Sequence, residues 1–327
     1  MTRKETKLKK KLKEQERAAS SPGAASEAHE RRPYEVKEIA GKGMGVIATG
    51  DIKAGELVLK ETPLITLQQQ RTPAALERLM TTLTQSQKDD YNKLHIASNK
   101  NNVPKVLAIF QTNAMQLGPQ STTSGVFIEG SRFNHSCRPN CSRSWDERQG
   151  VEWFIANRDI GQGEELCITY GDTRWDRVER QRWLMETFGF ECACEACSLS
   201  PDEVKSSDIN LRYIKETDKS SEMMRPVPLR LIPKINRSLR LMEKEGIVQG
   251  GADLAYEALS VCIWYGDRLN ASRWIDKTLE LERKEAGIWS TKYRDVEAWK
   301  GDPTRHLGWE DLCRRLGIPA KVLMGPE

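Results

Sequence analysis

The sequence predicts an α+β protein in which short strands come first and helices follow. Residues 34–67 and 125–170 alternate β-forming side chains with turn residues, which is typical of short strands joined by tight turns. Residues 73–117 instead carry apolar side chains three and four positions apart, the spacing of a buried helix face. Residues 229–300 repeat that helical spacing without any strand pattern. The second part of the chain is therefore expected to be all-helical.

Composition sets the class of protein. The chain has 327 residues, enough for two domains, and its 30% charged and 38% hydrophobic residues are ordinary for a soluble protein. No apolar run of about 18 residues exists, so no membrane-spanning helix is expected. The first residues are rich in Lys and Glu, which does not fit a secretory signal. We therefore expect a nuclear or cytoplasmic protein with no membrane partner.

The positive charge is concentrated in the first 32 residues. They contain ten Lys/Arg and five Asp/Glu, so this tail carries +5, and since the whole chain carries +4 the rest carries −1. With few apolar side chains, the tail cannot offset the entropy cost of ordering, and a disordered, solvated arm is expected. The run Lys9-Lys10-Lys11 leaves open a nuclear-import role or a chromatin contact.

The expected domain boundaries follow these patterns. They are a basic tail at 1–32, a mixed domain at 33–190 with a helical insert at 68–118, a cysteine loop at 191–199, a linker at 200–228 and a helical domain at 229–327. The helical domain has the paired helices of a tetratricopeptide-like array, although no fixed-period repeat is found. The helical domain has two possible roles: it could pack against the mixed domain, or it could form one wall of a substrate groove.

A short cysteine cluster indicates a metal site. Cys192, Cys194 and Cys197 place three thiolates in one tight loop, which suits tetrahedral zinc. The fourth ligand must come from elsewhere, because no histidine follows before His306. Eight cysteines without any sign of export favour a reducing compartment and a metal site over disulfides.

Three stretches in order resemble one known family. They are Arg132-Phe133-Asn134-His135-Ser136-Cys137, Glu164-Glu165-Leu166 leading to Tyr170-Gly171-Asp172, and Phe188-Gly189-Phe190 leading to the cysteine cluster. Together they resemble the SET-domain protein lysine methyltransferases, in the SMYD-like and fungal branch with a C-terminal helical domain. SMYD-type relatives carry a MYND zinc module within the SET region. It is absent here, because no cysteine precedes Cys137.

The resemblance implies a fold, an activity and a set of site residues. The fold would be the SET β-clip of short sheets, closed by a post-SET loop in which four cysteines bind zinc, and the activity transfer of a methyl group from S-adenosyl-L-methionine to a protein lysine. The implied cofactor-binding residues are Lys42, Gly43, Met44, Gly45, Ser131, Phe133, Asn134, His135, Phe188 and Phe190. Tyr170 would be catalytic and, with Phe127, would contact the substrate lysine. Core packing of Phe188 and Phe190 is compatible with their covering the adenine.

The resemblance also assigns the fourth zinc ligand. Cys137 matches the cysteine of the family's Asn-His-Ser-Cys motif, so Cys137, Cys192, Cys194 and Cys197 form the implied ligand set. Cys141 is the competing fourth ligand. The other three cysteines lie in apolar surroundings and are expected to be buried without a role in the site: Cys167, Cys262 and Cys313.

Two other functions compete with methyl transfer. One is a catalytically silent SET scaffold that binds a partner through the helical domain, which the intact Tyr170 and the full cysteine set disfavour. The other is a zinc-dependent nucleic-acid binder, which requires a basic folded body, whereas this one carries −1.

Overall fold

Ten short strands of the described residues form three sheets. This computed structural model describes residues 32–68, 72–223 and 229–327, and the basic tail predicted at 1–32 lies outside them apart from Arg32. The first sheet has the order β1-β2-β10-β7, the second β3-β9-β8 and the third β4-β6-β5. Their bounds are β1 Tyr34–Ile39, β2 Gly43–Ala48, β3 Leu57–Glu61, β4 Ile65–Leu67, β5 Met115–Gln116, β6 Ser124–Val126, β7 Asn134–His135, β8 Cys141–Asp146, β9 Val151–Ala156 and β10 Glu165–Ile168.

The first sheet positions the motif residues. Strands β1 and β2 form an antiparallel hairpin whose turn contains Lys42, and β10 pairs with β2. The other edge of β10 pairs in parallel with the two-residue strand β7, so Asn134 lies opposite Cys167. Two motifs that are separated by about thirty residues in the sequence are thereby held side by side.

The helical insert lies where the sequence predicts it. It consists of α2 Pro73–Thr81, α3 Gln85–Asn92, η1 Ser98–Lys100 and α4 Lys105–Asn113. The side chain of Thr72 caps the start of α2, and Thr84 with Gln87 forms a capping box at α3. Apolar side chains from these helices, including Leu76 and Phe110, form one buried cluster with strands β4 and β6.

The stretch expected to be a linker at 200–228 contains a long helix, α6 Pro201–Met223. The Ser200 hydroxyl donates to Glu203 at 2.6 Å at its start. Buried residues then recur at Ser207, Leu211 and Ile214, three and four positions apart on one helix face. Polar side chains around that sparse stripe make the sequence resemble a loop, but the stripe is enough to pack α6 against α7.

The second part of the chain is helical, as predicted. Its helices are α7 Ile232–Glu245, α8 Gly251–Trp264, α9 Arg268–Glu285, α10 Thr291–Glu297 and α11 Asp311–Leu316. The apolar spacing within residues 229–300 faces the core in α8 and α9, where Leu281 is partly buried and the following residues are buried: Leu254, Ala258, Val261, Cys262, Trp274 and Thr278. In the described residues no helix has both the length and the apolar character needed to span a bilayer.

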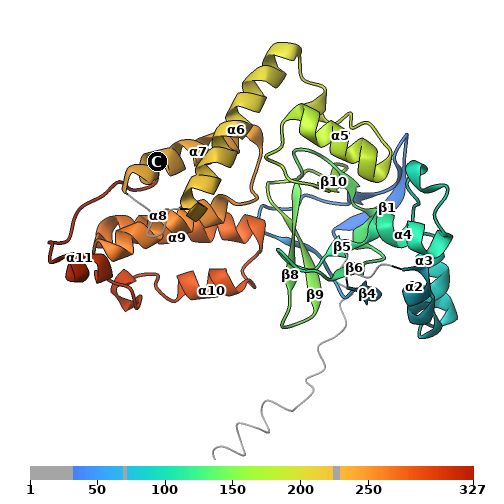
Figure 1. The fold of residues 1–327 in the computed structure, drawn as a ribbon, viewed down its shortest axis with the longest axis horizontal. Helices are drawn as coiled ribbons and strands as arrows, with labels where there is room; N and C mark the ends of the chain where they lie inside the picture. Colours follow the sequence, from blue (N-terminus) through green and yellow to red (C-terminus); the bar gives the residue numbers. More distant parts are fainter. Residues whose placement is uncertain (1–31, 69–71, 224–228) are drawn as a thin grey trace, which may run out of the picture. The chain divides into compact units, whose positions relative to one another are not determined.

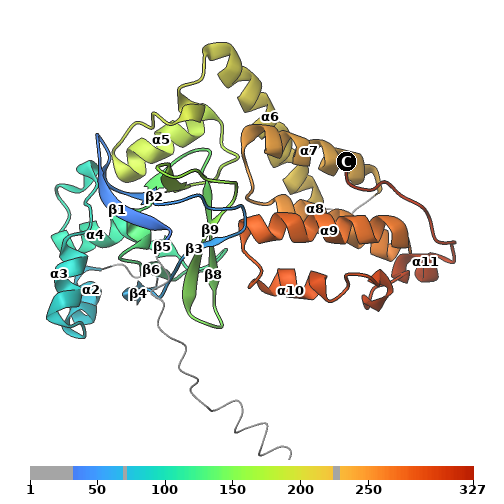
Figure 2. The same cartoon turned by 180° about the vertical axis from the view of Figure 1, so that it is seen from behind.

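Helix α9 packs against strands β8 and β9, and Figures 1 and 2 show the insert helices on the opposite side of the strands. Trp153 of β9 stacks on Trp289 with the ring centroids 4.7 Å apart. A partly buried ion pair also joins the two halves, since Arg138 Nη2 lies 2.8 Å from Oε2 of the buried Glu245 of α7. The same carboxylate accepts hydrogen bonds from Ser207 and Asn210 of α6.

Candidate active site and metal centre

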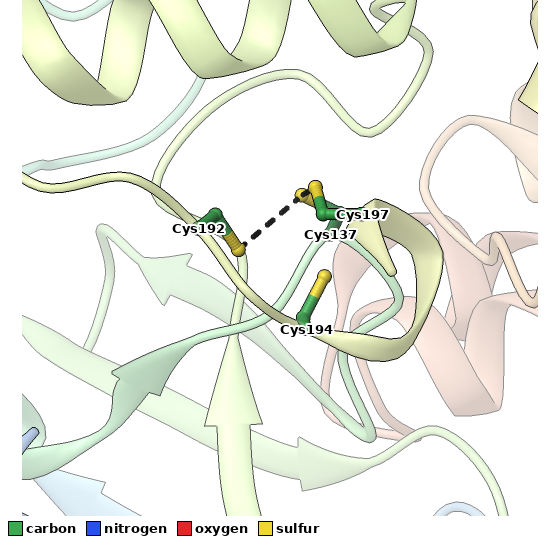
Figure 3. A group of neighbouring side chains, drawn as sticks. All are labelled: Cys137, Cys192, Cys194 and Cys197. Carbon is green, nitrogen blue, oxygen red and sulfur yellow. Dashed lines mark hydrogen bonds between the residues drawn. The ribbon is translucent and has the colours of Figure 1, made fainter. Parts of the chain in front are cut away.

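Four cysteine side chains meet beside the first sheet. Cys137 follows β7, and the other three lie in the loop after α5 Arg177–Phe188 that contains η3 Glu195–Cys197 (Figure 3). All four sulfur atoms lie within 4.8 Å of one another. Cys137 Sγ is 3.6 Å from Cys197 Sγ and 3.9 Å from Cys192 Sγ. Tetrahedral zinc with Zn–S bonds of about 2.3 Å requires sulfur separations of about 3.8 Å, so the thiols fit this ion.

Hydrogen bonds among the four thiols divide their pKa values. Those with Cys137 lower the pKa of Cys197 to about 6 and lower the pKa of Cys194, whereas the pKa values of Cys137 and Cys192 are raised. The buried Arg180 of α5 lies against this loop, donating to Ala196 O at 3.2 Å. A buried guanidinium beside several thiolates offsets part of their negative charge. Sequence reasoning missed Arg180, because nothing in its local pattern distinguishes it from other helix arginines.

The competing ligand lies elsewhere. The four-cysteine group contains Cys137 and not Cys141, which is the first residue of β8 and is buried. Cys167, Cys262 and Cys313 are also buried outside the group, as expected. Gln181 of α5 fixes the loop from the side, because its amide donates to Cys192 O at 2.7 Å and accepts from Cys192 N at 2.9 Å.

His135 connects the thiol group to the strand that carries Tyr170. The Tyr170 main-chain N–H donates to His135 Nδ1 at 3.0 Å, and His135 Nε2 lies 3.3 Å from Cys137 Sγ. Burial lowers the pKa of His135 to about 4, so the ring is neutral at physiological pH. Because Nδ1 accepts, the ring proton belongs on Nε2, facing the sulfur. The Tyr170 main-chain N–H and the Cys137 sulfur, at opposite ring nitrogens, thus fix the orientation of the imidazole.

Asn134 is held by a small polar network. Its amide Nδ2 donates to Glu165 Oε1 at 2.9 Å and to Met44 O at 3.3 Å. Glu165 Oε2 pairs with Lys42 Nζ at 2.6 Å, which joins the β1–β2 turn to β10. With both amide hydrogens directed at these acceptors, the Asn134 carbonyl oxygen is left as the group that can accept a bond from a ligand.

Gly45 permits this close approach. A Cβ at this position would lie 2.8 Å from Asn134 Nδ2 and 2.3 Å from Ile39 Cδ1. Gly43 has φ +75°, a conformation that only glycine adopts without strain. The turn therefore brings its main chain next to the Asn134 side chain. Contact of Lys42 to Gly45 with a cofactor stays a prediction.

Tyr170 lies at the centre of an aromatic group. Its hydroxyl donates to Phe133 O at 2.9 Å, and burial raises its pKa, so the hydroxyl stays protonated. The ring centroid of Tyr170 is 5.3 Å from that of His135 and 4.9 Å from that of Phe188. Phe190 completes the group, 6.3 Å from His135. The structure therefore brings Asn134, His135, Tyr170, Phe188 and Phe190 together beside the thiols.

The helical insert helps to hold the two phenylalanines. Gly189, between them, ends α5 in the left-handed region with φ 71°. Ser98 Oγ donates to Gly189 O at 2.9 Å, and Asn99 Nδ2 donates to Glu186 O at 2.8 Å. Sequence reasoning did not find these two residues, because turn-forming Ser and Asn carry no signal for a distant partner.

Three predicted residues take other positions. The Phe133 ring is buried and stacks on Phe154 with centroids 4.7 Å apart, so only its main chain faces Tyr170. Phe127 is fully buried, and its ring lies at 66° to that of Trp145 with the centroids 6.4 Å apart. Ser131 donates through its main chain to Phe127 O at 3.0 Å. Side-chain contacts of these three residues with a cofactor or a substrate stay predictions.

Comparisons with known proteins agree with the geometry. The SET-domain family model matches residues 43–171. Histone-lysine N-methyltransferase set5 of Schizosaccharomyces pombe (strain 972 / ATCC 24843) is 30% identical over 302 residues, 91% of this chain and 91% of that protein. Human protein-lysine N-trimethyltransferase SMYD5 is 39% identical over 83 residues, 24% of this chain and 20% of that protein. The chain belongs to the SET-domain family of protein lysine methyltransferases.

Proposed function

We propose that this protein transfers a methyl group from S-adenosyl-L-methionine to a lysine side chain of a protein substrate, and that Cys137, Cys192, Cys194 and Cys197 hold a structural zinc ion. The observation that carries the proposal is the convergence of Asn134, His135 and Tyr170 beside four thiols from two distant segments. A closed four-thiolate site leaves no open coordination position, so the metal would act on structure rather than on the reaction.

The chemistry assigns a role to each group. S-Adenosyl-L-methionine supplies an electrophilic methyl group on a sulfonium. The Tyr170 hydroxyl, already donating to Phe133 O, can accept a hydrogen bond from the lysine amine and orient its lone pair. The apolar surroundings of Tyr170 disfavour a charged ammonium, so the lysine loses its proton to water before transfer and no strong base is needed. Placement and fixed dipoles then supply most of the rate.

The substrate is proposed by analogy. The set5 relative, which matches 91% of this chain, is called a histone-lysine N-methyltransferase, so a histone lysine is the first candidate substrate. A histone substrate would place the protein in the nucleus. Another protein lysine, methylated in the cytoplasm, is the alternative. The chromatin contact predicted for the basic tail falls on residues outside the described ranges.

The test is transfer of labelled methyl groups from S-adenosyl-L-methionine to proteins of a cell extract. We expect label in one or more protein bands, recovered as methyl-lysine after hydrolysis. A matched extract whose lysines have been blocked by acetylation should take up none, because an amide nitrogen is not a nucleophile. Cofactor binding without transfer to any protein would instead support the silent scaffold.

The polar network around Asn134 makes a separate prediction. Glu165→Gln removes the ion pair with Lys42. The new Gln amide can donate a hydrogen bond as well as accept one, so the Asn134 side-chain amide can rotate by about 180° and present its oxygen to position 165. We expect the KM for S-adenosyl-L-methionine to rise about tenfold, the effect of about 1.4 kcal/mol, with kcat little changed.

Glu164→Gln is the matched control for that variant. The Glu164 carboxylate pairs with the exposed Arg158 and accepts from Gly161 N, in a turn without a predicted site role. Its KM should stay within about twofold of wild type, because exposed ion pairs contribute little. Equal KM values for the two variants would show that Glu165 does not position the amide.

A further inference from the structure

Residues 318–327 run in an extended conformation along the helical domain. After α11 the chain turns back and ends beside α7, as Figures 1 and 2 show. Three successive main-chain carbonyls of this segment each accept one hydrogen bond from a side chain of α7 or α9. The pairs are Leu323 with Asn270 Nδ2 at 2.9 Å, Met324 with Trp274 Nε1 at 3.0 Å and Gly325 with Asn236 Nδ2 at 3.0 Å.

The three donors belong to the interior of the helical domain. Asn236, Asn270 and Trp274 are 2%, 3% and 0% exposed. Buried polar side chains are almost always hydrogen-bonded, and these direct their donors at main-chain carbonyls that do not belong to any helix or strand. These three hydrogen bonds therefore reach main-chain atoms, which every residue type offers.

Asp267 and Asn270 together hold both main-chain groups of Leu323. Asp267 accepts from Leu323 N while Asn270 donates to Leu323 O. The two side chains are fixed to each other, because Asn270 Nδ2 also donates to Asp267 Oδ2 at 2.8 Å. A strand that pairs with an extended chain forms hydrogen bonds in the same way, because it accepts from the main-chain N–H of one residue and donates to the C=O of that same residue.

Few side chains of the segment are needed for the contact. Val322 and Met324 are 83% and 44% exposed, whereas Leu323 packs against the helical core. At Gly325 a Cβ would lie 2.6 Å from Asn270 Oδ1, so this position requires glycine. Glu327 pairs with Arg240, but both side chains are about half exposed and contribute little. The recognised pattern is Leu-x-Gly in an extended chain.

A cleft begins beside the last residue of the segment. Asn236, Arg240 and Glu327 line one part of a cleft of about 430 Å³ whose other wall includes Arg138 and Arg158. A longer chain bound in the same register could therefore extend past the position of Glu327.

We propose that the surface between α7 and α9 is a binding site for an extended segment of a partner protein with the pattern Leu-x-Gly, and that residues 321–327 occupy this site in cis. The exposure of Val322 and Met324 favours this reading over a permanent part of the core, because the segment adds little apolar burial to the domain apart from Leu323. The proposal is independent of methyl transfer.

The experiment uses the full chain with a protease recognition sequence inserted between the exposed Ala320 and Lys321. After folding and cleavage, a fluorescent peptide Lys-Val-Leu-Met-Gly-Pro-Glu should bind saturably by fluorescence anisotropy. The uncleaved protein should bind it at least about tenfold more weakly, because its own segment competes at an effective concentration near millimolar.

Peptide variants test the pattern without changing the protein. The Gly325→Val peptide should bind at least about tenfold more weakly, whereas the Met324→Lys peptide should stay within about twofold, because that side chain points to solvent. A peptide with alanine everywhere except Leu and Gly should bind within about fivefold of the original.

Three results would overturn the proposal. They are loss of helical circular dichroism on cleavage, no saturable binding by the cleaved protein, and equal binding of the original and Gly325→Val peptides. The first would make the segment an integral part of the domain, and the other two would remove the site or its recognition.

Discussion

Cys194→Ser is expected to lower bound zinc from about one ion per chain to below about a tenth and to abolish methyl transfer. The serine hydroxyl is not a thiolate, and the remaining three sulfurs cannot close the tetrahedron. Without the ion, the loop that carries Phe190 loses its tie to Cys137, and the His135 ring loses a fixed neighbour. Metal analysis by mass spectrometry, thermal unfolding and the labelled-methyl assay measure the three effects.

Cys313→Ser is the matched control for the metal site. Cys313 is also buried, but it belongs to α11 and its thiol donates to the main-chain carbonyls of Tyr265 and Pro319, as a hydroxyl can. Zinc content and methyl transfer should stay at the wild-type level. Zinc that is unchanged in Cys194→Ser, or lost equally in both variants, would contradict the ligand set.

Tyr170→Phe is expected to lower kcat by at least about 100-fold while leaving the affinity for S-adenosyl-L-methionine within about twofold. The variant keeps the ring that contacts His135 and Phe188 and removes only the hydroxyl that donates to Phe133 O. That hydroxyl is the group proposed to orient the lysine amine. Single-turnover methyl transfer and calorimetric cofactor binding separate the two quantities.

The chain offers a close control in Tyr91→Phe. The Tyr91 hydroxyl is likewise buried and donates to a main-chain carbonyl, that of Val106 at 2.8 Å, but it lies in the helical insert. Losing one such hydrogen bond costs about 1 kcal/mol of stability in either variant. If the two variants lose equal activity, the effect of Tyr170→Phe is a stability effect and the proposed role of the hydroxyl is wrong.

The sequence predicts best those features whose residues lie close together along the chain. The cysteine group follows from three cysteines in six residues and one motif cysteine, and the structure brings these four together. The helices of the second half follow from periodic apolar faces such as Ala258 and Trp274, which are buried. Patterns within one segment carry this information, except for Cys137, which the resemblance to the family motif assigns.

The remaining features depend on pairing between distant segments. The Lys42–Glu165 pair arises because β10 lies beside β2, which no local pattern indicates. The Phe133 ring stacks on Phe154 of β9, a contact between two segments that no pattern around Phe133 indicates. Helix α6 resembles a linker in sequence, since its apolar stripe is sparse among Ser, Asp and Lys.

The ion pair between Arg138 and Glu245 limits how this protein can be divided. Arg138 directly follows a proposed metal ligand, while Glu245 is buried and also accepts from two residues of α6. Dividing the chain after residue 199 removes this partner of Arg138 and uncovers apolar side chains such as Trp153, which stacks on Trp289 of the second half. Expression of residues 33–199 alone should therefore yield insoluble material, and a recombination event that exchanged the helical half for another would have to carry a matching carboxylate with it.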